Sequence, residues 1–189
     1  MTPSLRRVFL VSISCSVLAG CYAPGAEVSL SPDLERSSLR TVAVRPFADR
    51  GHLPAAGVTL SRAFEAAFLE RGVRVVPYDR VYRALSRASA DSGASSEEGW
   101  SADAWRRVHE ETGVDAVLTG TVTASEFVPG GMPPYLIECA FRLVEASGGE
   151  VLASGNANED GGSAPATASQ LARRVLGRFL GEPAAASAR

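Results

Sequence analysis

The sequence predicts an α/β domain with a mixed β-sheet of about five strands and about four helices. Three observations lead to this: short β-branched runs suited to buried strands, apolar residues at helical spacing between them, and a later stretch in which apolar and polar residues alternate. The chain has 189 residues, 46% of them hydrophobic, which fits one domain with a sizeable core.

The first elements form a strand–helix–strand unit. The β-branched run at 40–47 predicts a strand, and residues 48–57 predict a loop. Residues 60–68 place apolar side chains on one helical face, and the helix is expected to end at Gly72. A second strand follows at 73–76. Short connections of this kind predict parallel strands.

The remaining elements follow from capping residues and from the change to a period of two. They are a helix capped by Asp79, an exposed loop at 89–99, a helix from Ser101 to Gly113, a strand at 115–124, a Gly/Pro loop at 127–134, a strand at 135–144, a hairpin turn at 147–149, a strand at 151–156, a polar loop to Ser163, and a helix from about Pro165 to Phe179.

The amino terminus has the organisation of an export signal. Arg6 and Arg7 precede an apolar run at 8–18, which is shorter than the roughly 20 residues needed to span a bilayer. A basic start followed by a short apolar run is typical of a signal peptide, here residues 1–20.

The signal ends in Leu18-Ala19-Gly20-Cys21, which resembles the bacterial lipobox. The resemblance implies that Leu18, Ala19 and Gly20 are recognised by the lipoprotein signal peptidase. It also implies that Cys21 carries a diacylglycerol and an N-acyl chain. Each buried methylene contributes roughly 0.8 kcal/mol, so several chains make a firm membrane anchor. Tyr22 stands where inner-membrane lipoproteins carry Asp, which implies the outer membrane and a periplasm-facing domain.

These signals divide the chain into four parts. They are a signal peptide at 1–20, the lipidated cysteine with a flexible tether at 21–39, a single α/β domain at 40–181, and a disordered tail at 182–189. Cys15 leaves with the signal peptide, so Cys139 is the one thiol left for the fold. No internal disulfide is expected.

Charge and residue types exclude several functions. The net charge is −2, and loss of Arg6 and Arg7 takes it to −4, so no nucleic-acid partner is expected. The chain contains two histidines, His52 and His109, with no second ligand nearby, so no metal site is expected. Neither a serine-hydrolase elbow nor a phosphate-binding loop is present, and Cys139 alternates with core residues. We expect no catalytic residues, no cofactor and no enzymatic activity.

A group of sequence segments resembles a known superfamily. These segments are Val42-Ala43-Val44-x-Pro46-Phe47, Gly72-x-x-Val75-Val76, Gly113-Val114-Asp115-Ala116-Val117-Leu118-x-Gly120-x-Val122 and Gly149-Glu150-Val151-Leu152. The chain is similar over about residues 40–180 to the superfamily that includes the amino-terminal domain of TolB, the curli-secretion lipoprotein CsgG and the penicillin-binding-protein activator LpoB.

This resemblance implies a non-enzymatic lipoprotein whose domain binds another envelope protein in cell-envelope assembly or secretion. Two alternatives stay open: an LptE-like lipopolysaccharide-assembly lipoprotein, and an activator of a peptidoglycan synthase. The helical segment at 79–112 argues against the first. The loops at 89–99 and 127–134 are too short to supply the membrane-spanning hairpins of the curli channel.

The sequence offers one candidate partner surface. The loop that contains Phe127 and Met132, with Tyr135 beside it, carries apolar side chains that a solvated loop does not need. The expected partners are therefore the membrane, reached through the lipid anchor, and an envelope protein.

Overall fold

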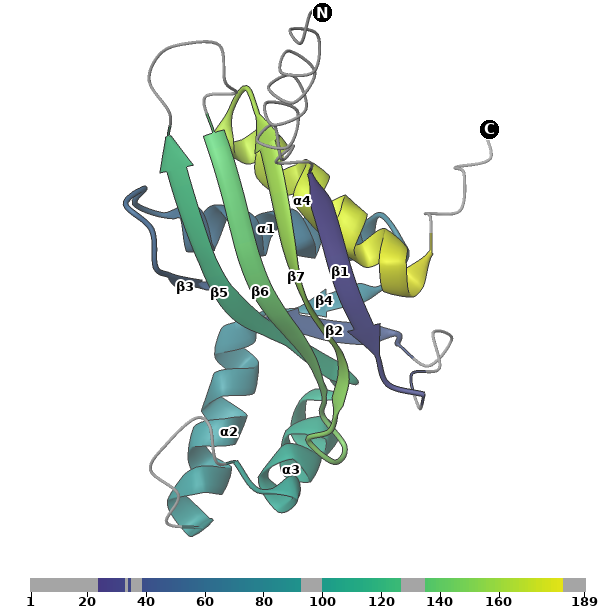
Figure 1. The fold of residues 1–189 in the computed structure, drawn as a ribbon. Coiled ribbons are helices and arrows are strands. Elements are labelled where there is room, and N and C mark those ends of the chain that lie inside the picture. The colour runs from purple at the N-terminus through teal and green to yellow at the C-terminus, as the bar shows by residue number, and fades with distance from the viewer. Residues whose placement is uncertain (1–23, 33, 35–38, 93–99, 127–134, 182–189) are drawn as a thin grey trace, which may run out of the picture.

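A computed structural model describes residues 24–32, 34, 39–92, 100–126 and 135–181, which form a seven-stranded mixed sheet with four α-helices (Figure 1). The strands are β1 (Gly25–Leu30), β2 (Thr41–Val44), β3 (Ala48–Asp49), β4 (Arg74–Val76), β5 (Ala116–Glu126), β6 (Tyr135–Glu145) and β7 (Val151–Gly161). The helices are α1 (Ala56–Leu69), α2 (Tyr78–Ser92), α3 (Ala102–Thr112) and α4 (Ala164–Leu180). The predicted α/β class is confirmed.

The sheet combines a parallel part with an antiparallel part. Its strand order is β1-β7-β6-β5-β2-β4, and β3 pairs with β5 beside this path. Strands β2 and β4 are parallel, as the strand–helix–strand pattern predicts, and β2 is also parallel to β5. Strands β5, β6 and β7 are long antiparallel neighbours, and β1 is antiparallel to β7 at the edge.

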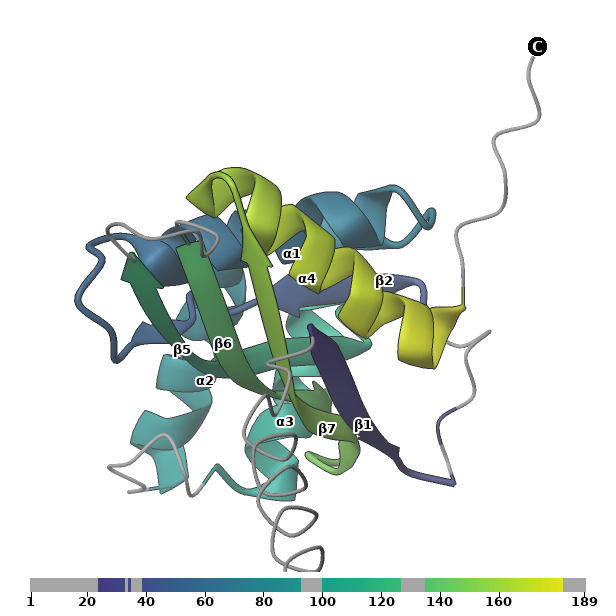
Figure 2. The same cartoon turned by 45° about the horizontal axis from the view of Figure 1, so that its top comes forward.

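The helices cover the two faces of the sheet unequally. Helices α1 and α4 pack on one face, whereas α2 and α3 lie on the other face at one end (Figure 2). The larger core cluster includes Phe64, Phe68 and Phe179 from α1 and α4. A smaller cluster joins Val81, Leu85, Trp105 and Val108 of α2 and α3 to the sheet around Val117. Among the residues that the structure describes, no helix covers the rest of the second face.

The structure confirms the two residues predicted to bound α3, Ser101 at its start and Gly113 at its end. The Ser101 side chain accepts a hydrogen bond from the Ala104 N–H at 3.2 Å, which caps the first turn. At the other end Gly113 adopts φ 65°, and its N–H donates to the His109 carbonyl at 2.8 Å. The chain then turns directly into β5.

The predicted tether at 21–39 is wrong for residues 25–30, which form the edge strand β1. All six of these residues are in register with β7. Apolar Ala26, Val28 and Leu30 alternate with polar Glu27 and Ser29, and Ala26 and Val28 pack on the main core. The alternation is that of a strand with one buried face. Pairing with the sheet satisfies backbone groups that a tether would leave to water.

Three smaller expectations also need correction. Strand β7 continues to Gly161, so the predicted polar loop after residue 156 begins later. Helix α2 continues to Ser92, into the segment predicted as a loop from residue 89. The predicted loop at 48–57 contains the two-residue strand β3 and the start of α1. With β1 and β3, the sheet has seven strands where the sequence predicted about five.

Candidate functional site: the open face of the sheet

The candidate site lies on the part of the second sheet face that none of the four described helices covers, which we call the open face. In β5, Val117 faces the α2–α3 core, and Thr119, Thr121 and Thr123 follow it on the same side of the strand. The intervening residues Leu118 and Val122 are buried against α1 and α4. Strand β5 therefore runs out from beneath the helices, and its threonines stand on an uncovered surface.

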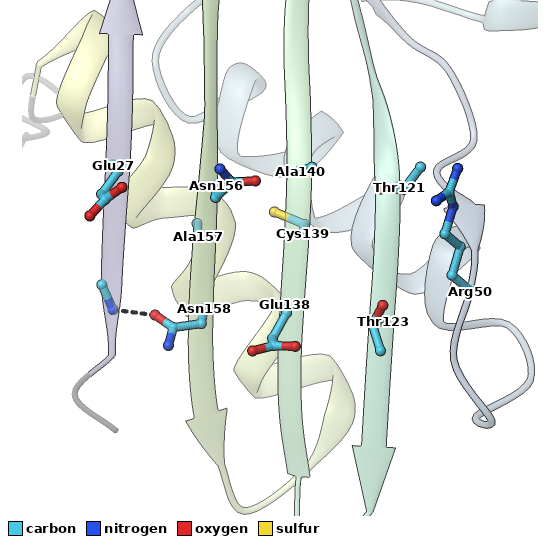
Figure 3. A pocket seen from close by; sticks show the side chains of 11 residues that line it. Glu27, Arg50, Thr121, Thr123, Glu138, Cys139, Ala140, Asn156, Ala157 and Asn158 are labelled. Atoms are coloured by element: carbon cyan, nitrogen blue, oxygen red, sulfur yellow. Dashed lines mark hydrogen bonds between the residues drawn. The ribbon is translucent and has the colours of Figure 1, made fainter. Parts of the chain in front are cut away.

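Strand register extends this polar surface across four strands. Thr123 lies opposite Glu138, Glu138 opposite Asn158, and Asn158 opposite Gly25. The neighbouring row consists of Thr121, Ala140, Asn156 and Glu27. Figure 3 shows these two rows side by side across β5, β6, β7 and β1.

The two rows line a shallow cavity of about 580 Å³. Its lining residues are Gly25, Glu27, Arg50, Thr121, Thr123, Glu138, Cys139, Ala140, Asn156, Ala157 and Asn158. Cys139 and Ala157 are buried in the core beneath, so they contribute little surface to the open side. The surface consists mainly of hydroxyl, amide and charged groups.

Two contacts between β1 and β7 hold this edge of the site. The Asn158 Oδ1 accepts a hydrogen bond from the Gly25 N–H at 2.7 Å, which ties the start of β1 to β7. A Cβ added at Gly155 would collide with the Glu27 carbonyl oxygen. Only glycine lets β1 approach β7 this closely, so Gly155 fixes the position of Glu27 beside the site.

Arg50 reaches the open face from the other side. Its N–H donates to the Val122 carbonyl at 2.8 Å, directly after the short pairing of β3 with β5. The side chain lies beside Thr121 and Thr123 at the border of the cavity (Figure 3). The site thus carries one guanidinium group opposite two carboxylates, Glu27 and Glu138.

The chemistry of the open face suits binding. Hydroxyl and amide side chains offer both hydrogen-bond donors and acceptors. The charged groups at the border can form stronger and more specific hydrogen bonds with a partner. Among the described residues there is no group of three His, Cys, Asp or Glu side chains that could hold a metal. The Cys139 thiol is buried, and burial raises its pKa to about 12, so it stays neutral and unreactive at physiological pH.

The sequence-predicted site residues lie elsewhere. Leu18, Ala19, Gly20 and the lipidation site Cys21 are outside the described residues, as are Phe127 and Met132. Tyr135 is described: it is the half-buried first residue of β6 and pairs with Glu126 and Gly161.

The two histidines lie in α3 and in the segment before α1. His109 lies on α3, where its Nδ1 donates to the Val114 carbonyl at 2.8 Å across the helix end. His52 is exposed in the segment before α1. The structure brings neither of them to the open face.

Sequence reasoning missed the open face for a physical reason. The alternation of Thr119, Thr121 and Thr123 with apolar residues shows that one side of the strand is polar, but it does not show how far the helices extend over that side. The signal for Asn156, Asn158 and Asp160 was also present, because Ala157 and buried Glu159 alternate with them. The polar composition of this stretch favours a loop, but its alternation with a period of two predicts the strand that the structure contains.

The described residues form a mixed α/β domain with helices α1 and α4 over one sheet face and a second face that α2 and α3 cover only in part. No family model and no curated protein matches the chain. Its fold is similar to PelC from Paraburkholderia phytofirmans, whose solved structure is a dodecamer. The identity is 20% and the TM-score 0.55, over 83% of this chain and 97% of that chain. This likeness establishes a shared fold.

Solved structures of two superfamily members named by the sequence resemblance also match. The LpoB carboxy-terminal domain from Escherichia coli is 15% identical, with a TM-score of 0.38 over 64% of this chain and 82% of that chain. TolB from Acinetobacter baumannii is 14% identical, with a TM-score of 0.40 over 86% of this chain and 32% of that chain. Likenesses at these TM-scores say nothing about the residues of the open face. The relation to CsgG stays a prediction.

Within the described part of the chain, no helix is both long enough and apolar enough to cross a membrane.

Proposed function

We propose that this chain is a non-enzymatic outer-membrane lipoprotein, anchored through Cys21, whose periplasmic domain binds another envelope protein through the open face. The observation that carries the proposal is the uncovered polar surface made by Thr121, Thr123, Glu138 and Asn156. Strands β5, β6, β7 and β1 are antiparallel, and an antiparallel sheet can leave a polar face exposed to solvent, where a partner can reach it.

The residue types of the open face support binding over catalysis. Among the described residues that line the cavity there is no histidine, and the cysteine is buried, so neither threonine hydroxyl has a histidine beside it that could activate it as a nucleophile. Polar side chains held on strands are well placed for a binding surface, because the sheet fixes their spacing.

Photo-crosslinking in living cells tests this proposal. A photoreactive amino acid replaces Thr121 or Asn156 on the open face, and in a matched control it replaces exposed Gln170 on α4, on the other side of the sheet. We expect a discrete adduct with an envelope protein from positions 121 and 156 and none from 170. Equal adducts from all three positions, or from 170 alone, would refute the open face as the binding surface.

The identity of the crosslinked protein separates the alternatives. An outer-membrane β-barrel would favour an LptE-like role, and a peptidoglycan synthase would favour an activator. A component of a secretion system would favour the leading proposal. A double variant, Thr121→Arg with Asn156→Arg, should remove the adduct of a reporter at Thr123 while leaving the melting temperature nearly unchanged, because both side chains are outside the core.

We also propose that copies of this chain assemble with one another. The similarity of fold to the PelC dodecamer, over nearly the whole of that chain, supports the idea.

The edge strand β1 offers a physical means by which copies could pair. The Ser31 N–H donates to the Leu152 carbonyl and the Gly25 N–H donates toward Asn158, so odd-numbered residues direct their backbone groups to β7. The backbone groups of Ala26, Val28 and Leu30 therefore face outward, ready to pair with another strand.

A further inference from the structure

Few residues of the sequence separate Cys21 from the folded domain. The tether predicted from the sequence had its folded end near residue 39, but β1 begins at Gly25. Only Tyr22, Ala23 and Pro24 separate Cys21 from the sheet. Fully extended, four steps along the chain span about 14 Å at roughly 3.3–3.6 Å each. A lipid attached at Cys21 would hold Gly25 within that distance of the membrane surface.

The attachment point is fixed firmly to the rest of the domain. Every residue of β1 is in register with β7, and the Gly25 N–H is bonded to Asn158. Strand β7 is in turn paired with β6 along its length. Because β1 belongs to the sheet, restricting its first residue restricts the position of the whole sheet end.

Register identifies which end of the domain this is. Gly25 lies opposite Asn158, three residues from Gly161, the last residue of β7. Gly161 lies opposite Tyr135, and Tyr135 opposite Glu126 at the end of β5. Figure 1 shows the start of β1, the end of β5 and the start of β6 at one end of the molecule, with α2 and α3 at the other. We call the first of these the sheet tip.

The two ends differ in the surface they offer. At the sheet tip, Tyr135 is half-buried, and the first turn of α4 carries the uncharged residues Ala164, Pro165 and Ala166. Tyrosine is enriched at membrane interfaces, where its ring and hydroxyl meet different surroundings. Glu126 and Asp160 add negative charge nearby, so the lipid anchor and not electrostatic attraction must hold this end at the membrane.

The opposite end carries charged side chains. Exposed ion pairs join Arg83 to Asp79 on α2 at 2.7 Å and Arg106 to Asp103 on α3 at 2.9 Å. Another pair joins the two helices. Charged groups of this kind favour bulk water over the interior of a membrane interface. The exposed ion pairs of the α2–α3 end therefore agree with a position away from the membrane.

We propose that the sheet tip rests on the lipid surface of the membrane and that the α2–α3 end points away from it. This orientation depends on the lipid anchor proposed above. An 11-residue strand such as β5 spans roughly 36 Å, so the far end lies tens of ångströms from the bilayer. The open face, whose strands run from the tip toward α2 and α3, then stands at the membrane surface, accessible to a partner in the same membrane.

A pair of fluorescent reporters tests the orientation. Ala166 and Ala102 are exposed alanines in the first turns of α4 and α3, at the two ends of the domain, and each is changed to cysteine in turn. Cys139 is buried, so labelling is directed to the new thiol. The lipidated protein is purified from membranes, labelled, and reconstituted into phosphatidylcholine vesicles that contain lipid with a nitroxide quencher on the headgroup.

We expect several-fold stronger quenching of the label at Ala166→Cys than of the label at Ala102→Cys. Insertion of 20 Gly and Ser residues between Ala23 and Pro24 should keep the protein on the vesicles and remove most of the difference, because such a linker has an average span of about 25 Å. Equal quenching of the two labels in vesicle-bound protein overturns the orientation alone. Failure of the protein to sediment with the vesicles overturns both the anchor and the orientation.

Discussion

The indole ring of Trp105 fills the space into which a side chain at Gly149 would extend. A Cβ added at Gly149 would collide with Trp105 Cδ1 and lie 3.0 Å from Nε1. Gly149 also adopts φ 79° in the turn between β6 and β7. The Gly-Glu-Val-Leu segment, which contributed to the sequence resemblance, therefore has a structural explanation: its glycine lets the β6–β7 hairpin close over α3.

Replacing Gly149 with alanine should destabilise the domain markedly. The variant would suffer both the positive φ, which costs about 1 kcal/mol or more in a residue with a Cβ, and the collision with Trp105, which adds about 1–3 kcal/mol. Gly72→Ala is the matched control, because Gly72 has φ 76° and no atom within 4 Å of the added Cβ. Thermal melting should show a clearly larger loss for Gly149→Ala. Equal losses would mean that the ring of Trp105 moves aside freely.

Asp115 should prove to be a structural residue. Its Oδ2 accepts hydrogen bonds from the backbone N–H groups of Arg40 at 2.9 Å and Thr41 at 2.8 Å, and so joins the starts of β2 and β5. Asp115→Ala leaves both donors without this partner and should lower the free energy of unfolding by about 1–3 kcal/mol. Asp115→Asn keeps an acceptor oxygen and should recover part of the loss. Urea denaturation of both variants measures it, and an unchanged midpoint for Asp115→Ala would contradict the assignment.

Glu159 should make folding depend on pH in a defined direction. This side chain is 4% exposed, and its Oε2 lies 2.8 Å from Arg174 Nη1. Burial raises the pKa of Glu159, Arg174 lowers it in part, and Asp160 raises it, with a net upward shift. A carboxyl whose folded pKa is raised destabilises the fold where it is ionised, and this cost disappears as pH falls through the folded pKa toward 4.5.

Glu159→Gln tests this direction, because glutamine cannot ionise. The stability of the variant relative to the wild type should rise as pH increases from 4 toward 7. Chemical denaturation of both proteins across this range provides the comparison. A variant that instead loses relative stability on going to neutral pH would show that the attraction of Arg174 exceeds the cost of burying the carboxylate.

Two prolines placed in β1 distinguish its inner and outer sides. Ala26→Pro removes an N–H that faces outward, so it should leave the isolated domain nearly as stable and prevent pairing between copies. Glu27→Pro removes an N–H directed at β7, and it should lower the free energy of unfolding by about 1–3 kcal/mol. Light scattering coupled to size exclusion measures assembly. Oligomers of undiminished size from Ala26→Pro would show that copies associate through another surface.

The parts of the fold that were predictable from sequence are those with a local signal. The helix period at Leu60, Phe64 and Phe68, the capping by Ser101 and the glycine end at Gly113 were each readable from a few neighbouring residues. The hairpin of β6 and β7 followed from alternation and a glycine turn. In each case the residues that specify the element lie within or beside it.

The parts that were missed depend on distant contacts. Strand β1 exists because β7, more than a hundred residues later, offers it an edge, and a short Gly/Pro-flanked segment without that edge has the composition of a tether. The open face requires knowledge of where α2 and α3 stop covering the sheet, which Thr121 and Asn156 cannot indicate by themselves. Tertiary arrangement decides both features.

Metabolic labelling measures whether Cys21 carries the fatty acids that we propose fix this domain at a membrane. Cells that produce the wild-type chain or Cys21→Ala are grown with radioactive palmitate, and the purified products are compared after extraction of free lipid. We expect label in the wild type and none in the variant. Unlabelled wild type, or equal label in both proteins, would contradict the anchor and every conclusion that depends on it.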